Sequence, residues 1–221
     1  MAEHGASLSF AQGARKVLPF SIAVLGFGMS FGVLARPSMG EVAPILMSAT
    51  TFAGSAQFAA ASILGAGGTL AAAVVAAVLL NARYGPIGLS VAPALRGPWW
   101  SRFLRAQLVV DETWALSADG RGGHDPKVLV GAGLVLYAAW VAGTATGVLF
   151  GDLLGDPARL GLDAAFPALF LALLTPSLDR TEARVAAVLG AAIALALTPT
   201  APAGVPIVVA GLACLVGWRR R

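Results

Sequence analysis

Residues 42–82 read VAPILMSATTFAGSAQFAAASILGAGGTLAAAVVAAVLLNA, and no charged side chain interrupts the run. The run is too long for one membrane-spanning helix of about 20 residues, and Gly65-Ala66-Gly67-Gly68 divides it. We therefore expect two helices, over roughly 42–64 and from 69 onward. Continuous runs rich in Ala, Leu and Val favour helices within a membrane, because the strands of a membrane barrel would alternate in polarity.

Small polar residues stand at the centre of this run, in Thr50-Thr51-Phe52-Ala53-Gly54-Ser55-Ala56-Gln57-Phe58. In hydrocarbon a polar group has no water to bond, so it needs a protein partner, an ion or a substrate. Such residues form a binding site or join neighbouring helices, and residue type alone leaves both open. On a regular helix Ser55 and Gln57 face about 200° apart. Both can contact one substrate only if the helix is unwound near Gly54, so we predict a broken or re-entrant helix at 53–57.

The composition predicts the same class for the whole chain. Of its 221 residues 57% are hydrophobic and 12% charged, whereas a soluble domain carries about a quarter charged residues. We predict an all-α, polytopic helical membrane protein, a single domain over 1–221. It should have about seven apolar segments, some of them short, broken or re-entrant. The net charge of +4 fits membrane orientation better than nucleic-acid binding.

The remaining apolar segments flank a polar region at about 96–127, which separates two helical halves. Clear spans are expected at 17–35 and 128–151, and the stretch 36–41 between the first span and the long run should be a turn. Within the polar region, 103–118 fits either a surface helix or a short span. Shorter apolar segments follow at 164–178 and 185–218.

The distribution of Lys and Arg predicts the orientation. A cytoplasmic C-terminus, ending in Trp218-Arg219-Arg220-Arg221, places the basic region 96–127 inside and the acidic loop 152–163 outside, as the positive-inside rule requires. The number of crossings before residue 128 stays open.

Arg83 is the only charged residue between Val42 and Leu95. Gly85-Pro86, just after it, should break or kink the helix. The arginine therefore either extends to the membrane interface or lies inside the bundle beside a broken helix, and the sequence leaves both open. Asp111-Glu112, close to several arginines, fits a solvated helix face or a polar site.

The chain lacks the motifs of several enzyme classes. Neither Lys16 nor Lys127 follows the glycine loop that ATP hydrolysis requires. His4 and His124 lie in polar segments, so neither a membrane-embedded serine protease nor a metal site is expected. We therefore predict no enzyme, no cofactor and no metal, and with Cys214 as the one cysteine, no internal disulfide.

The remaining polar groups suit a small zwitterion such as an amino acid. A broken-helix N-terminus and an arginine can bind its carboxylate, and carbonyl, hydroxyl and amide oxygens can bind its ammonium. Asp111 and Glu112 are candidates for coupling to an ion. The candidate substrate-binding residues are Thr51, Phe52, Gly54, Ser55, Gln57, Phe58, Asn81 and Arg83.

Four motifs occur in an order that resembles the AzlC-type proteins, the large subunits of bacterial branched-chain amino acid exporters. The resemblance extends from about Gly13 to the last helix, and the family usually has Leu where this chain has Ala82. The motifs are Phe52-Ala53-Gly54-Ser55-Ala56-Gln57-Phe58, Asn81-Ala82-Arg83-Tyr84, Asp111-Glu112 and Gly161-Leu162-Asp163-Ala164-Ala165-Phe166-Pro167-Ala168.

The resemblance implies export of leucine, isoleucine, valine and similar apolar amino acids, driven by an ion gradient, with protons as the expected ion. It also implies a bacterial cytoplasmic membrane protein with a small membrane partner of the AzlD type. The alternatives are a non-transporting scaffold subunit, whose polar motifs bind only helices of the partner, and a passive channel.

Overall fold

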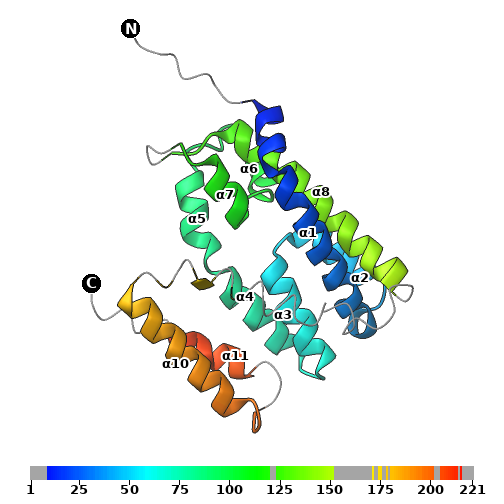
Figure 1. Cartoon of the computed structure of the whole chain (residues 1–221), viewed down its shortest axis with the longest axis vertical. Coiled ribbons are helices and arrows are strands. Elements are labelled where there is room, and N and C mark those ends of the chain that lie inside the picture. Colours follow the sequence, from blue (N-terminus) through cyan, green and yellow to red (C-terminus); the bar gives the residue numbers. More distant parts are fainter. Residues whose placement is uncertain are drawn as a thin grey trace.

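The protein is described from a computed structural model, which covers residues 9–119, 123–151, 171, 174–175, 178, 180–201, 205–213 and 215. Within these ranges the structure is helical, apart from an isolated bridge between Ala118 and His124. The predicted all-α class is confirmed. The helices are α1 (Phe10–Met39), α2 (Val42–Thr51), α3 (Gly54–Gly65), α4 (Leu70–Asn81), α5 (Tyr84–Val91), α6 (Trp99–Ala106), α7 (Asp111–Ser117), α8 (Pro126–Phe150), α10 (Thr181–Leu197) and α11 (Val205–Ala210) (Figure 1).

Two of these helices, α1 and α8, are long and apolar enough to cross a membrane. Helices α4 and α5 add a third span if they are taken together, since they pass the same test as a pair bent by 44°. The described part of the chain therefore supports two or three spans, fewer than the seven apolar segments expected. The loop expected at 152–163 and nearly all of the segment 164–178 lie outside the described residues.

Helix α1 is longer than the span predicted at 17–35. Its start is fixed by a capping box, in which Ser9 Oγ accepts from the Gln12 N–H and Gln12 Oε1 accepts from the Ser9 N–H. The turn expected at 36–41 is confined to residues 40–41, because the helix continues through 36–39 and ends at Met39. Its C-cap is Gly40, whose φ of 73° suits glycine.

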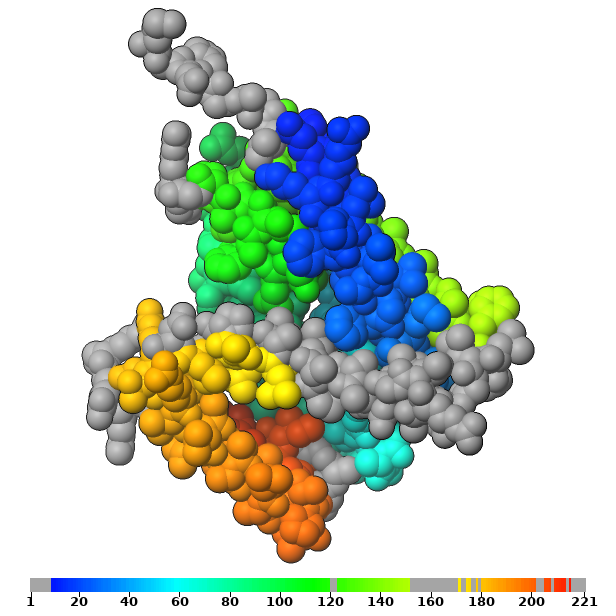
Figure 2. Space-filling model, viewed as in Figure 1, coloured from blue at the N-terminus to red at the C-terminus, as the bar shows by residue number. Residues whose placement is uncertain are grey.

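Helices α1 and α8 lie side by side along one edge of the molecule (Figures 1 and 2). Glycines bring their backbones together. A Cβ on Gly28 would stand 2.6 Å from the Trp140 carbonyl oxygen, and a Cβ on Gly32 or Gly147 would also collide with the facing backbone. Such close approach by small residues is the usual way helices associate in membranes, and it makes this pair the frame for the remaining helices.

Helices α2 and α3 form a broken pair that packs on this frame. Helix α3 contacts α1 and α4, and α2 contacts α8. Helices α10 and α11 pack on each other, and α11 contacts α4 (Figure 1).

The region 96–127, expected as a polar loop, contains two short helices, α6 and α7. Neither is long enough to be a membrane span, so the alternative of a crossing at 103–118 is not supported. A hydrogen bond of 2.9 Å from Trp114 Nε1 to Ser90 Oγ joins α7 to α5. Thr113 Oγ1 accepts from the Val110 N–H at 2.9 Å and so caps the first turn of α7. These contacts place Asp111 and Glu112 against the interior.

Candidate functional site

The central feature of the site is the break between α2 and α3. Helix α2 ends at Thr51, its C-cap Phe52 has φ 40° and ψ 55°, and α3 begins at Gly54. Among the described residues other than glycine, Phe52 is the one with positive φ. An aromatic residue adopts this left-handed conformation only where its surroundings impose it. The break therefore lies at residues 52–53, at the edge of the stretch 53–57 where it was expected, and α3 is regular from Gly54 onward.

Gln57 connects the two sides of the break and is fully buried. Its Oε1 accepts from the Ala53 N–H and from Trp140 Nε1, each at 3.1 Å. Its Nε2 donates to Ser48 Oγ at 2.9 Å. Because the backbone N–H and the indole N–H can only donate, they fix which way the amide points.

The network continues from Ser48 into α8. Ser48 Oγ lies 2.8 Å from Thr144 Oγ1, and Thr144 donates to the Trp140 carbonyl oxygen at 2.9 Å. Ser48 is therefore the hydrogen-bond donor to Thr144. Tyr137 adds a bond of 2.6 Å from its hydroxyl to the Ala49 carbonyl oxygen. These bonds hold the ends of α2 and α3 against α8, and each adds about 1 kcal/mol to stability.

Arg83 points into the protein rather than away from it. Its Nη2 donates to Ser55 Oγ at 3.0 Å and pairs with Asp111 Oδ2 at 3.0 Å. Its guanidinium carbon lies 5.3 Å from the centre of the Tyr84 ring, within the range of a cation–π contact. Side chains from α3 and α7 thus meet at the junction of α4 and α5.

A small cavity of about 70 Å³ lies beside this ion pair. Gly54, Ser55 and Arg83 line it together with Asp111 and Glu112. Helix α7 is outside the candidate spans, and burial raises the pKa of the Glu112 carboxyl, with the charge of Asp111 as a further cause. Glu112 is therefore easier to protonate than a glutamate in water.

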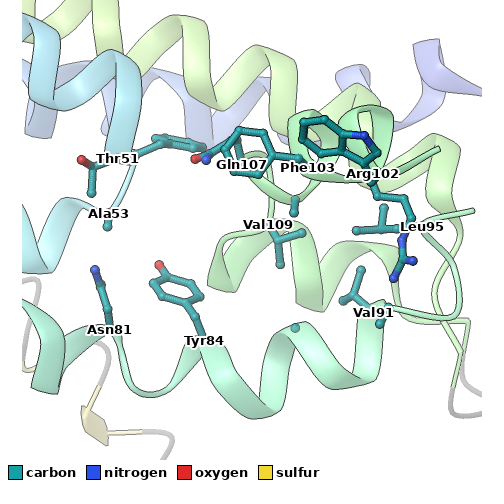
Figure 3. A pocket seen from close by; sticks show the side chains of 15 residues that line it. Thr51, Ala53, Asn81, Tyr84, Val91, Leu95, Arg102, Phe103, Gln107 and Val109 are labelled. Atoms are coloured by element: carbon teal, nitrogen blue, oxygen red, sulfur yellow. The ribbon is translucent and has the colours of Figure 1, made fainter. Parts of the chain in front are cut away.

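A second cavity of about 570 Å³ lies between the helix break, the bent pair α4–α5 and helix α6. Thr51, Asn81 and Tyr84 stand at one end of it, whereas Val91, Leu95 and Arg102 stand at the other (Figure 3). Phe52 and Tyr84 line both cavities and so form the partition between them.

The predicted site residues fall into three groups. Phe52, Thr51 and Asn81 line the large cavity, and the small cavity is lined by Gly54, Ser55, Arg83, Asp111, Glu112 and again Phe52. Gln57 and Phe58 line neither. Phe58 is buried in the core, where its ring packs on Phe31 at 5.6 Å and on Trp140 at 6.2 Å. Ser55 and Gln57, on a regular helix, therefore face different neighbours.

Sequence reasoning missed the wall that α6 contributes to the large cavity. Trp99, Arg102, Phe103 and Ala106 line it, at the spacing of one helix face. That spacing is visible in the sequence, but the high charge of the region led to its assignment as a polar loop.

Comparison with known proteins identifies relatives of the whole chain. The family model described as AzlC protein matches residues 19–154. An uncharacterized membrane protein of Archaeoglobus fulgidus is 35% identical over 96% of each chain. The inner membrane protein YgaZ of Escherichia coli is 25% identical over 94% of this chain and 88% of its own. The branched-chain amino acid transport protein AzlC of Bacillus subtilis is 27% identical over 82% of this chain and 74% of its own. No solved structure matches the chain.

Proposed function

Because this chain belongs to the AzlC family of membrane transport proteins, we propose that it exports branched-chain and similar apolar amino acids from the bacterial cytoplasm. One relative, the Bacillus subtilis protein, carries branched-chain amino acid transport in its name. The substrate, the outward direction and the use of a proton gradient are part of the proposal.

The observation that carries this proposal is the large cavity, which has polar side chains beside the helix break and apolar side chains farther along it. A volume of about 570 Å³ lies within the usual range of small-molecule sites, about 300–1,000 Å³. The small cavity, at about 70 Å³, is well below that range. We therefore place the amino acid in the large cavity, next to the helix break.

The polar end of the cavity fits the ammonium and carboxylate of an amino acid. Thr51 offers a hydroxyl and Asn81 a side-chain amide at this end, groups that can donate to the carboxylate and accept from the ammonium. The aliphatic side chain then points toward Val91 and Leu95 (Figure 3).

The small cavity suits proton coupling. Arg83 neutralises Asp111 by direct contact, which leaves Glu112, whose carboxyl pKa is raised by burial, as the second carboxyl of the cavity. Gain and loss of one proton there changes the charge beside Phe52 and Tyr84, the residues that separate it from the substrate. We propose that this proton moves inward as the amino acid moves outward.

The resemblance also supports a small membrane partner of the AzlD type and a cytoplasmic C-terminus. The C-terminal arginines on which the orientation rests lie outside the described residues.

Everted membrane vesicles from cells that express the chain with its small partner test the proposal. In such vesicles export appears as uptake. A pH gradient with the vesicle lumen acidic should therefore drive labelled leucine into the lumen, above its external concentration. Collapse of the gradient by an ionophore should stop accumulation. Uptake that only equilibrates leucine would indicate a passive channel, and partner assembly without uptake would indicate a scaffold.

Gly88→Leu should block this uptake, and Gly85→Leu should not. Both glycines lie in α5 and a Cβ on either meets nothing within 4 Å, but only Gly88 lines the large cavity. Both changes favour the helix, so neither should unfold α5. We expect leucine uptake to fall at least about tenfold in Gly88→Leu, which corresponds to about 1.4 kcal/mol of lost binding free energy. In Gly85→Leu uptake should stay within about twofold of the wild type. Equal loss in both variants would contradict the placement of the substrate.

A further inference from the structure

The large cavity is longer than one amino acid requires. Along α5 it is lined by Tyr84, Gly88, Val91 and Ala92, which share one face of the helix. At a rise of 1.5 Å per residue, Tyr84 and Ala92 are about 12 Å apart along the axis. The cavity is therefore a slot that follows α5, with α6 along its other side.

The far end of the slot holds a guanidinium without a charged partner among the described residues. Arg102 projects from α6 beside Leu95 and Val91 (Figure 3). It makes no hydrogen bond or ion pair within the described ranges of the chain. Arg105, one turn further along α6, differs from it because its Nη1 donates to the Arg96 carbonyl oxygen at 3.1 Å and it does not line the cavity. Arg102 is thus available to an anionic group in the slot.

The two ends of the slot cannot be used together by one α-amino acid. Its ammonium and carboxylate are bonded to the same carbon, so both charges must stay near one end. A peptide of two residues separates its terminal charges by about 7 Å, and one of three residues by about 10 Å, at 3.3–3.6 Å per residue. Such molecules extend over more than half of the slot, and apolar side chains line it between its ends.

From this match we propose that the same cavity accepts short apolar peptides of two or three residues. The peptide ammonium binds at the end formed by Thr51 and Asn81, the carboxylate binds Arg102, and the apolar side chains pack on Val91 and Leu95. The inference rests on the proposed function, since it extends the substrates of the same cavity, and Arg102 becomes the residue that distinguishes peptides from amino acids.

Uptake of labelled leucyl-leucine and of labelled leucine by the same everted vesicles tests the inference. Wild-type vesicles should take up both, and unlabelled leucyl-leucine should compete with leucine. Arg102→Gln should lower peptide uptake at least about tenfold more than leucine uptake, and Arg102→Lys, which keeps the positive charge, should restore part of it. Arg105→Gln should leave the ratio of the two uptakes unchanged.

The outcomes separate the two proposals. If leucine is transported and leucyl-leucine is neither transported nor competes, the inference is wrong and the proposed function stands. If leucyl-leucine alone is transported, the inference stands and the proposed amino acid substrate is wrong. If Arg102→Gln and Arg105→Gln lower both uptakes equally, Arg102 contacts lipid at the membrane surface rather than the peptide, and the inference is overturned.

Discussion

Arg83→Ala is expected to abolish leucine transport while the protein still reaches the membrane. The change removes the charge that neutralises Asp111 and the donor that Ser55 accepts from. The two side chains are 33% and 29% exposed, so loss of their charge-assisted hydrogen bonds costs about 1.5–3 kcal/mol, which corresponds to about tenfold or more in transport rate. Leucine uptake in everted vesicles, normalised to the amount of protein, measures the loss.

Arg83→Lys tests whether this position needs only a positive charge or also the planar guanidinium. A lysine keeps the charge but lacks the planar group that lies against Tyr84 and reaches both Ser55 and Asp111. We expect it to retain less than about one tenth of the wild-type uptake. Arg36→Ala is the matched control, because Arg36 pairs with Glu41 at the same 3.0 Å and its side chain is 28% exposed against 33% for Arg83. Normal transport by Arg83→Lys would show that the position needs only a positive charge.

Gln57→Ala should have the second large effect, through the helix break. Without the amide, the Ala53 N–H, the Trp140 indole N–H and the Ser48 hydroxyl all lose a partner in a fully buried region. Each buried group left unpartnered costs about 1–3 kcal/mol. The variant should therefore unfold at a clearly lower temperature in detergent and lose most of its leucine uptake.

This result distinguishes a positioning role for Gln57 from direct contact with the substrate. A residue that only binds substrate would raise the KM for leucine and leave the unfolding temperature unchanged. Ser62→Ala serves as the control within α3, because the Ser62 side chain makes no hydrogen bond among the described residues. If Gln57→Ala kept wild-type stability and only raised the KM for leucine, the hydrogen-bond network of Gln57 would not be what holds the helix break.

The class of the protein and the place of its central motif follow from the sequence because both depend on local composition. An uncharged run of this length predicts membrane helices, and the small polar residues at its centre indicate where a break can lie. The residue at the break was less predictable. Glycine is the usual residue for positive φ, yet Gly54 starts α3 and Phe52 adopts it. The reason lies in distant contacts, with Tyr137 packing edge-on against the Phe52 ring at 5.4 Å.

The sequence indicates which charged residues are candidates for the site, but not which of them are in contact. Arg83 and Asp111 both stood out as charges near apolar segments, but their contact joins α7 to the junction of α4 and α5. Only the packing of the helices shows it. The proposed role of Arg102 was not predictable for a different reason. The charge around it suggests a solvated loop, although its neighbours on α6 line a cavity.

Photolabelling with a diazirine analogue of leucine tests the central claim, that the large cavity at the helix break binds the transported amino acid. Irradiation of vesicles that contain the full chain, followed by mass spectrometry of its peptides, locates the label. The account predicts label in the segments that line the cavity, 84–95 and 99–109, and its loss when excess leucine is present. Leucine-sensitive label confined to other segments, such as α10, would contradict the account.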